Sequence, residues 1–248
     1  MSNKIVIISI KNNRLNKVFY IIYKMIKLCI FDMDGLLIDS ERYMWTVSMD
    51  IATKEQGYVM TDEFHSMFMG KSRENTIKMC KEHFGPGFDA ERMFERSDEL
   101  NQDIIKNNKV PLMNGVLPLL QYLKENNIKM CVGTSSVRKV VEQILTNLKI
   151  IDYFDVLVCG DEVINGKPNP EIYIKCLERF NVKKEEAVIL EDGDSGGQAA
   201  IAAGVRLVLV PDLAYVGDEV KSKAYKVLDN IADMIEIVKE ENERATCI

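Results

Sequence analysis

The sequence contains few of the residues that form histidine- or cysteine-based metal sites. Only two histidines, His65 and His83, occur in 248 residues, which argues against a histidine-ligated metal centre. Six cysteines are present, but none has the C-x-x-C spacing of a zinc or redox motif. Several lie within apolar strand or helix patterns, so we expect small buried side chains in a reducing compartment. The sequence therefore indicates a cytoplasmic protein without a disulfide framework.

An excess of basic charge is also missing. The formal net charge is −6 at pH 7, which argues against a general nucleic-acid-binding surface. An anionic substrate would therefore need local positive groups in order to enter a site. The hydrophobic content of 47% and the charged content of 28% are ordinary for a globular protein. A chain of this length can form one large core and a small lid, and we expect a monomer.

Residues 1–24 differ from the rest of the chain. They contain five basic residues, no acidic residue and two short apolar runs. Neither run reaches the roughly 18 residues that a membrane-spanning helix needs, so we expect no stable membrane insertion. One interpretation is a membrane-surface or targeting segment. The second, which we favour, is that translation starts at Met25, directly before the first expected strand, and that residues 1–24 are an extension outside the native protein or a loosely attached tail.

The most informative segment begins with a short apolar run from Leu28 to Phe31, which predicts a buried strand. Asp32, Asp34 and Gly35 follow it directly as Asp-x-Asp-Gly. Open α/β sheets bind ligands at the carboxyl ends of their strands. Two neighbouring carboxylates repel each other unless a cation or a proton lies between them, so the pair suits Mg²⁺ chemistry. Taken alone, the tetrapeptide is equally compatible with an ordinary turn.

Two further apolar segments also end in polar groups. The segment 128–133 is followed by Thr134 and Ser135, and a later one ends in Glu191 and Asp192. If all three segments are parallel strands of one sheet, their carboxyl ends meet at one edge. The sequence therefore predicts a polar site assembled from three strand ends.

A lysine lies between these segments, in Gly-Lys167-Pro-Asn169-Pro170. Asn169 suits a helix N-cap and Pro170 the first helical position. The order of paired aspartates, hydroxyls, a lysine and a second acidic pair resembles the four motifs of the haloacid dehalogenase-like superfamily of phosphotransferases and hydrolases. The resemblance covers roughly residues 25–212, and it is the combination of motifs that is specific.

Alternating strand and helix patterns predict an α/β fold with a doubly wound, Rossmann-like parallel sheet. We expect strands near 27–32, 128–133, 155–159, 187–191, 205–210 and 225–228. We expect helices over 115–126, 136–148, 169–180, 195–203 and 230–242.

About seventy residues between Ser40 and Pro111 have helical patterns. Apolar residues at positions 44, 47 and 51 follow the helical period, and the stretches 72–83 and 89–108 also indicate helices. An all-helical insertion at this point is similar to the small cap of the branch that contains β-phosphoglucomutase and sugar-phosphate phosphatases. We therefore expect a core of residues 25–40 and 111–248, a helical cap of residues 41–110, and residues 1–24 as the extension.

The resemblance implies a role for each acidic residue. Asp32 is expected to be the nucleophile, which forms an aspartyl-phosphate, and Asp34 the general acid and base. Mg²⁺ is expected to be bound by Asp32, the Asp34 backbone carbonyl and Asp192. Glu191 is a metal ligand in some members of the superfamily and holds a water in others.

The resemblance also implies the groups that bind the substrate. Thr134 and the Ser135 backbone N–H are expected to hold phosphoryl oxygens, and Lys167 to supply positive charge beside them. For Ser135, helix capping is an alternative to substrate contact. Arg73 in the cap corresponds to a position that binds a second phosphate or a sugar group. The alternative for Arg73 is an exposed charge at a helix start.

Three functions follow from these features. The leading one is a magnesium-dependent phosphatase that acts on a small phosphorylated metabolite, such as a sugar phosphate. A β-phosphoglucomutase-like phosphomutase is the second, but Met44 stands where the resemblance implies a cap histidine, which favours hydrolysis. A non-catalytic binding or regulatory protein on the same fold is a weaker third.

Overall fold

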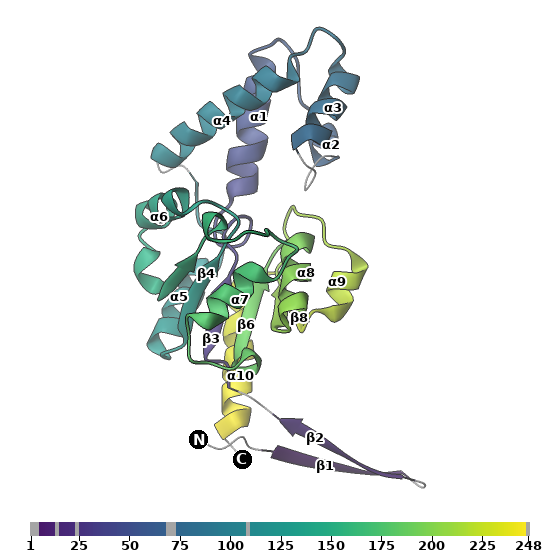
Figure 1. Cartoon of the computed structure of the whole chain (residues 1–248), viewed down its shortest axis with the longest axis vertical. Helices are drawn as coiled ribbons and strands as arrows, with labels where there is room; N and C mark the ends of the chain where they lie inside the picture. Colours follow the sequence, from purple (N-terminus) through teal and green to yellow (C-terminus); the bar gives the residue numbers. More distant parts are fainter. Residues whose placement is uncertain (1–4, 13–14, 23–24, 68–72, 108–109, 247–248) are drawn as a thin grey trace.

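A six-stranded parallel sheet forms the centre of the molecule in the computed structural model (Figure 1). The structure describes residues 5–12, 15–22, 25–67, 73–107 and 110–246. The strands of this sheet, in their spatial order, are β5 (Val156–Val158), β4 (Lys129–Gly133), β3 (Leu28–Phe31), β6 (Ala187–Glu191), β7 (Arg206–Leu209) and β8 (Lys226–Val227). All six lie within one residue of the predicted ranges, so the predicted α/β fold is confirmed.

Helices cover both faces of this sheet, because both faces of its central strands are apolar. In β3, Cys29 and Phe31 join one hydrophobic cluster, whereas Leu28 and Ile30 join the other. The first cluster includes side chains of α5 (Val116–Glu125), α6 (Arg138–Asn147) and α10 (Met234–Thr246). The second includes side chains of α7 (Glu171–Glu178), α8 (Asp194–Ala203) and α9 (Asp218–Lys223). Short 3₁₀ helices are η2 (Ile151–Tyr153), η3 (Gly160–Glu162), η4 (Lys184–Glu186) and η5 (Ile231–Asp233).

The order of the strands places a crevice beside β3. The chain first runs outward from β3 through β4 to β5, and then crosses to the other side of β3 to form β6, β7 and β8. The direction of winding therefore reverses between β3 and β6, and parallel sheets bind ligands at the carboxyl ends of the strands at such a point.

A helical insertion, defined here as residues 41–106, separates β3 from α5. It comprises the π-helix η1 (Glu41–Val47), α1 (Ser48–Lys54), α2 (Asp62–Ser66), α3 (Arg73–Phe84) and α4 (Ala90–Lys106). These helices share a separate apolar cluster that includes Met49, Phe64 and Met93. The two segments that connect the insertion to the core lie side by side. Between them, the Asp39 N–H donates to the Pro111 carbonyl across 3.0 Å.

The buried face of α1 differs from the one that the apolar period predicts. Val47 and Ile51 are exposed, whereas Met49 and Ala52 are buried. The Oγ atoms of Ser48 in α1 and Ser97 in α4 also lie 2.7 Å apart. The wide π-helical turn that precedes α1 changes the phase of the helix, so a period counted from position 44 points to the wrong face. The predicted boundaries of the cap stay a prediction.

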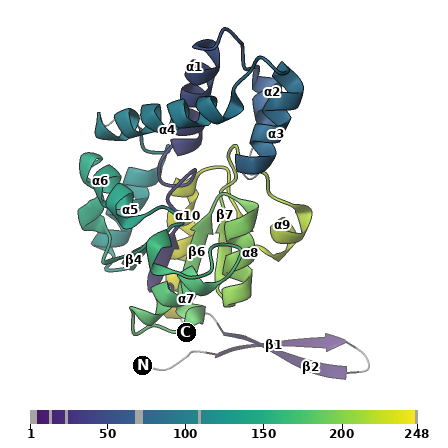
Figure 2. The same cartoon turned by 45° about the horizontal axis from the view of Figure 1, so that its top comes forward.

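Residues before the core form an antiparallel hairpin of β1 (Ile5–Asn12) and β2 (Leu15–Ile22). This hairpin is not part of the six-stranded sheet, and it lies beyond the end of the core opposite the helical insertion (Figures 1 and 2). The strands expected from the sequence do not include this hairpin. The chain enters the core at Ile26, which is buried and whose N–H donates to Asn242 Oδ1 across 2.9 Å.

The cysteines and the apolar segments of the described part of the chain bear on two expectations from the sequence. The five cysteines that it includes are all free and buried, as expected, and Cys247 lies outside the described residues. None of the helices in that part has both the length and the apolar character needed to cross a bilayer.

Candidate active site

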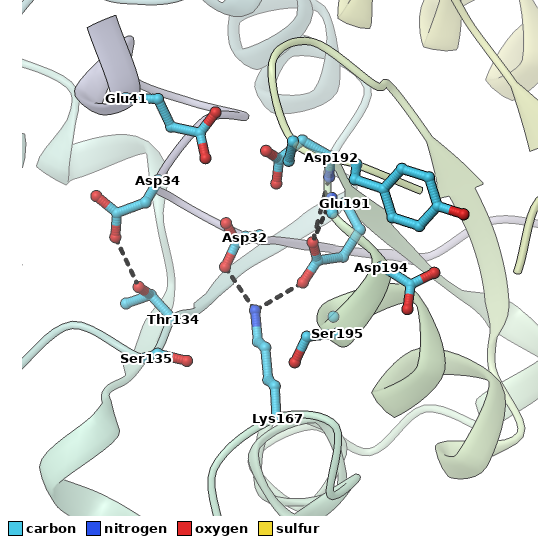
Figure 3. A pocket seen from close by; sticks show the side chains of 14 residues that line it. Asp32, Asp34, Glu41, Thr134, Ser135, Lys167, Glu191, Asp192, Asp194 and Ser195 are labelled. Carbon is cyan, nitrogen blue, oxygen red and sulfur yellow. Dashed lines mark hydrogen bonds and ion pairs between the residues drawn. The ribbon is translucent and has the colours of Figure 1, made fainter. Parts of the chain in front are cut away.

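The polar groups predicted from three strand ends meet in one cavity of about 440 Å³ (Figure 3). Asp32 follows β3, Thr134 follows β4, and Glu191 ends β6. Lys167 reaches the same cavity from the loop before α7. Of the predicted site residues, the cavity is lined by Asp32, Asp34, Thr134, Ser135, Lys167, Glu191 and Asp192.

Lys167 lies between two carboxylates at the base of this cavity. Its Nζ is 2.5 Å from Asp32 Oδ1 and 2.7 Å from Glu191 Oε1, and all three side chains are less than a tenth exposed. Burial alone would favour the neutral amine, but the charges of Asp32 and Glu191 raise the pKa of Lys167 well above its usual value. Lys167 is therefore a fixed positive charge in the site.

Asp32 keeps a raised pKa despite this partner. Burial raises the pKa of its carboxyl to about 7, opposed by Lys167 and reinforced by the charges of Glu191 and Asp34. One lysine does not neutralise the carboxylates that surround it. The site therefore has an excess of negative charge that a cation would relieve.

Three buried carboxylates are positioned to share such a cation. Ligand oxygens of Asp32, Glu191 and Asp192 all lie within 4.8 Å of one another. Burial, followed by the charges of Asp32 and Glu191, also raises the pKa of Asp192 well above its usual value. An all-oxygen donor set of this kind fits a hard divalent cation such as Mg²⁺.

Two glycines make room for these carboxylates. A Cβ atom on Gly35, whose φ is +80°, would lie 2.2 Å from Asp192 Oδ2. A Cβ on Gly196 in α8 would lie 1.7 Å from Glu191 Oε1. Both positions therefore require glycine for close approach, and Gly35 also for its left-handed backbone conformation.

Tyr173 is a site residue that the sequence analysis missed. Its hydroxyl donates a hydrogen bond to Glu191 Oε1, the same oxygen that Lys167 contacts. Glu191 Oε2 accepts the backbone N–H of Asp192 across 3.2 Å. Burial raises the pKa of the Tyr173 phenol well above its usual value, so it stays a donor. The sequence offered one signal for this role: Tyr173 is a hydroxyl-bearing residue within the otherwise apolar buried face of α7.

Asp34 faces the hydroxyl groups that follow β4. Ser136 Oγ donates to Asp34 Oδ2 across 2.8 Å, and Thr134 Oγ1 lies 3.4 Å from the same oxygen. The Ser136 backbone N–H donates to Thr134 Oγ1 across 3.1 Å, which links the two hydroxyls. The capping alternative for Ser135 is wrong, because the N-cap of α6 is Val137 and no side chain caps it.

The helix start after Lys167 also differs slightly from the prediction. Helix α7 begins at Glu171, and Pro170 rather than Asn169 occupies the N-cap. Asn169 still satisfies a free backbone donor, because its Oδ1 accepts the Glu171 N–H across 3.0 Å. The helix therefore begins two residues after the start of the predicted range 169–180, and one residue after Pro170, the predicted first helical position.

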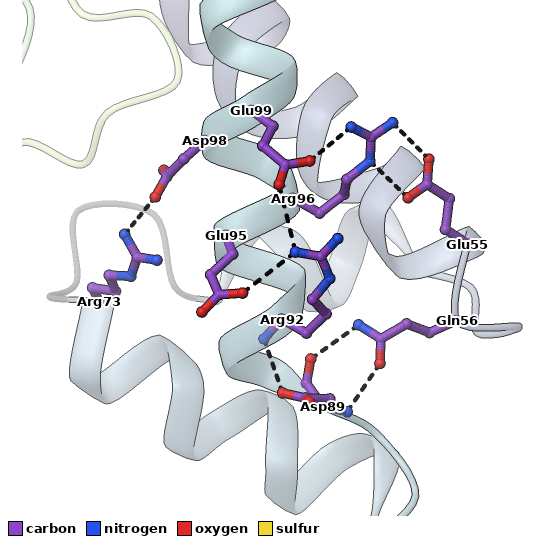
Figure 4. A network of polar contacts seen from close by, with 9 residues as sticks. All are labelled: Glu55, Gln56, Arg73, Asp89, Arg92, Glu95, Arg96, Asp98 and Glu99. Atoms are coloured by element: carbon purple, nitrogen blue, oxygen red, sulfur yellow. Dashed lines mark hydrogen bonds and ion pairs between the residues drawn. The ribbon is translucent and has the colours of Figure 1, made fainter.

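Arg73 is not among the residues that line the cavity. It lies at the start of α3, where its Nη1 is 2.8 Å from Asp98 Oδ2 (Figure 4) and its guanidinium stacks over the Phe94 ring at 4.7 Å. Figure 4 shows that charged pairs are frequent along α4, where Arg96 donates two hydrogen bonds to the Glu55 carboxylate. The preceding residues 68–72 lie outside the described part of the chain. In this structure Arg73 is a surface charge paired within the insertion.

Glu41 and two residues of the loop after β7, Ala214 and Tyr215, also line the cavity, and the sequence analysis gave none of them a role. Burial, followed by the charges of Asp212 and Asp34, raises the pKa of Glu41 to about 7. Its Oε2 is buried without a hydrogen-bond partner among the described residues. Glu41 therefore adds an acceptor, or a donor when protonated, above the aspartates.

Comparison with known proteins agrees with this geometry. Residues 29–210 match the family model of haloacid dehalogenase-like hydrolases. The chain is 34% identical over 211 residues to the probable pseudouridine-5'-phosphatase of Drosophila melanogaster, which covers 83% of this chain and 90% of that protein. It is 34% identical over 183 residues to the phosphorylated carbohydrates phosphatase of Thermotoga maritima, which covers 72% and 82%.

A similar structure has also been solved. The crystal structure of the putative β-phosphoglucomutase from Thermotoga maritima is 29% identical, has a TM-score of 0.73 and covers 86% of this chain and 99% of that one. A match over 86% of this chain is larger than the part outside the helical insertion, so it includes at least part of the insertion as well.

Proposed function

This chain belongs to the haloacid dehalogenase-like hydrolases, and from that premise we propose that it is a magnesium-dependent phosphatase that hydrolyses a small phosphorylated metabolite of the sugar-phosphate class. The two relatives described above are named as phosphatases of pseudouridine 5'-phosphate and of phosphorylated carbohydrates. Both names describe a phosphate group on a sugar, and the proposed substrate class is therefore sugar phosphates.

One observation carries the proposal: the buried arrangement of Lys167 between Asp32 and Glu191, open to a cavity that also contains Asp34. Phosphoryl transfer depends mostly on positioning and on charge neutralisation at the phosphoryl oxygens. Lys167, a buried cation beside the Asp32 carboxylate, supplies both the positioning and the charge neutralisation. The same arrangement would be a costly way to stabilise a fold, because the three buried carboxylates of Asp32, Glu191 and Asp192 have only one lysine between them.

The reaction would proceed in two steps on this chain's own residues. In the first, an Asp32 oxygen attacks phosphorus, the bond from phosphorus to the ester oxygen breaks, and Asp34 gives its proton to the leaving alcohol. In the second, Asp34 takes a proton from water as that water attacks the aspartyl-phosphate, which releases orthophosphate and regenerates Asp32. Ser136 and Thr134 hold the Asp34 carboxyl in place for both steps.

The residues that would hold Mg²⁺ are Asp32, Glu191 and Asp192, with the Asp34 carbonyl as the additional ligand that the resemblance implies. When bound, Mg²⁺ would neutralise charge between the nucleophile and the phosphoryl group. Thr134, Ser135 and Lys167 would bind the phosphoryl oxygens.

The helical insertion would act as a cap over the cavity, with the boundaries expected from the sequence. It joins the core through two adjacent segments around Asp39 and Pro111, a geometry that suits a hinge. Location in the cytoplasm and a monomeric state stay predictions from the sequence.

A phosphomutase is the second candidate, favoured by the likeness to the putative β-phosphoglucomutase structure. The chemistry on Asp32 is common to both, so the cap would decide between them. Arg73, the cap residue proposed to bind a second anionic group, is paired with Asp98 in this structure, and a methionine occupies position 44. Hydrolysis therefore remains the proposal.

A coupled assay tests the proposal. The protein is incubated with phosphorylated metabolites with and without Mg²⁺, and one reaction contains β-glucose 1-phosphate with a trace of the 1,6-bisphosphate. We expect Mg²⁺-dependent release of orthophosphate that Asp32→Asn abolishes, which also excludes a contaminating phosphatase. Rapid formation of glucose 6-phosphate with little orthophosphate would instead establish the mutase.

A further inference from the structure

An exposed aromatic side chain lies at the wall of the candidate active site. Tyr215 is 74% exposed, yet it lines the same cavity as Asp32 and Lys167. It belongs to the loop that links β7 to α9, and the next residue, Val216, is buried in the core. An aromatic ring left this open to water has a large apolar area that only a ligand or another surface can cover.

The loop that carries Tyr215 is held in place by hydrogen bonds both before and after this residue in the chain. Before it, Asp212 forms two hydrogen bonds with the Arg42 guanidinium, at 2.7 and 2.8 Å. After it, the Gly217 N–H donates to Asp194 Oδ1 across 2.8 Å. The loop is therefore anchored before and after Tyr215, which keeps this exposed residue in the cavity wall.

The position of this loop in the sheet sets its distance from the phosphate chemistry. Strand β7 lies two strands from β3, with β6 between them. Neighbouring strands are about 4.8 Å apart, so the end of β7 lies on the order of 10 Å from the end of β3. Tyr215 follows six residues after the end of β7 and lines the same cavity as Asp32, so a sugar or nucleoside ring attached to a phosphate at Asp32 would share the cavity with it.

We propose that Tyr215 contacts the part of the substrate beyond the phosphate, and that it makes the site prefer phosphate monoesters that carry a ring over acyclic ones. This inference rests on the proposed phosphatase function. A flat phenol ring complements the apolar face of a sugar ring or of a base, whereas an acyclic alcohol covers little of it. The neighbouring residue in the cavity wall, Ala214, has a small side chain.

The test compares Tyr215→Ala with Tyr215→Phe and with Leu213→Ala. Leu213 is on the same loop and 40% exposed, but it is not among the residues that line the cavity. The substrates are ribose 5-phosphate and uridine 5'-phosphate, which carry rings, and glycerol 3-phosphate and acetyl phosphate, which do not. Unchanged melting temperatures of the three variants verify that each is folded.

We expect the wild-type protein to have the higher kcat/KM for a ring-bearing substrate, and Tyr215→Ala to lower that value about tenfold, mainly through KM, as expected for the loss of one aromatic contact. Tyr215→Phe and Leu213→Ala should stay within about twofold of wild type, and acetyl phosphate turnover should not change. A loss with both ring substrates identifies the sugar as the contact, and a loss with the nucleotide alone identifies the base.

Several results would overturn the inference. Wild-type preference for glycerol 3-phosphate would contradict the selection of rings. An equal loss with acetyl phosphate would show that Tyr215 supports the catalytic core or the closed insertion. Unchanged KM for the ring substrates in Tyr215→Ala would show that the ring is not a contact. In each of these cases Mg²⁺-dependent hydrolysis by the wild type would persist, whereas its absence with every substrate would refute the proposed function itself.

Discussion

Lys167 and Asp32 form an ion pair of 2.5 Å in which neither side chain is more than a tenth exposed. The two residues are 135 positions apart in the sequence, and the loop before α7 brings them together at the end of β3. The proposed nucleophile therefore has a permanent cationic neighbour before any metal or substrate binds. This neighbour keeps the buried carboxylate compatible with a stable fold.

Asp32→Asn should abolish turnover without unfolding the protein. The amide has nearly the shape of the carboxylate but cannot act as the nucleophile, so no aspartyl-phosphate can form. Release of orthophosphate should fall to the level measured with excess chelator. Circular dichroism should show an unchanged secondary structure. Wild-type turnover by this variant would exclude the aspartyl-phosphate mechanism.

Tyr173→Phe should weaken metal binding while the fold persists. The hydroxyl orients Glu191, and loss of a residue that orients a metal ligand raises the dissociation constant about 10–100-fold. The dissociation constant can be measured from the thermal shift on titration with Mg²⁺ and from the Mg²⁺ dependence of activity. Tyr225→Phe is the matched control, because Tyr225 donates a 2.8 Å hydrogen bond to Glu241 away from the site. Equal Mg²⁺ affinity in both variants would contradict the role of Tyr173.

The stability of the metal-free protein should fall as pH rises from about 4 to about 7. Burial raises the pKa of Asp32 from 3.8 to about 7, so in this range the folded protein binds more protons than the unfolded chain does. Raising the pH therefore favours unfolding. Chelator-treated protein should show this trend in its melting temperature, where each kcal/mol corresponds to about 2–4 °C for a protein of this size.

Added Mg²⁺ should reverse this trend, because the cation competes with protons for the same carboxylates. The increase in melting temperature on adding Mg²⁺ should be larger at about pH 8 than at about pH 5. Asp192→Asn should reduce the increase at both values, since it removes one carboxylate of the cluster. A thermal shift that is independent of pH would show that Mg²⁺ binds elsewhere.

A chain that begins at Met25 should fold and retain activity. The hairpin β1–β2 is separate from the six-stranded sheet, whereas Ile26 is buried and bonded to Asn242. As the control, a chain whose first residue after the initiator is Leu28 also loses Ile26, so its melting temperature should be lower. Aggregation or inactivity of the chain that begins at Met25 would show that residues 1–24 belong to the working structure.

The strands and the polar groups at their ends could be predicted because the signals are local. An apolar run that stops at Asp32 or at Thr134 indicates both the strand and the edge at which it ends. The order of the motifs then indicated the family. The helix starts were predicted less closely than the strands: α7 begins two residues after the start of its predicted range, because the ends of helices are defined by cap geometry more than by the apolar pattern.

Other features of the site have no local signal. Tyr173 bonds to Glu191 from a helix whose apolar pattern predicts only core packing, and Tyr215 comes from a loop that no motif marks. Their place in the cavity depends on the packing of α7 against the sheet and on the ion pair that anchors the loop after β7. Such contacts join residues far apart in the chain, so they follow from the assembled fold.

The sequence by itself determined the strand ends, the chemical groups on them and the helical nature of the insertion, because each depends on the pattern of neighbouring residues. Only the tertiary structure decided which partners the long side chains have. Lys167, which the motifs already indicated for the site, is buried between two carboxylates, whereas Arg73 pairs with Asp98 on the insertion. An exposed ion pair contributes only about 0–1 kcal/mol, so the choice of partner for an arginine depends on which acidic group the fold places within reach.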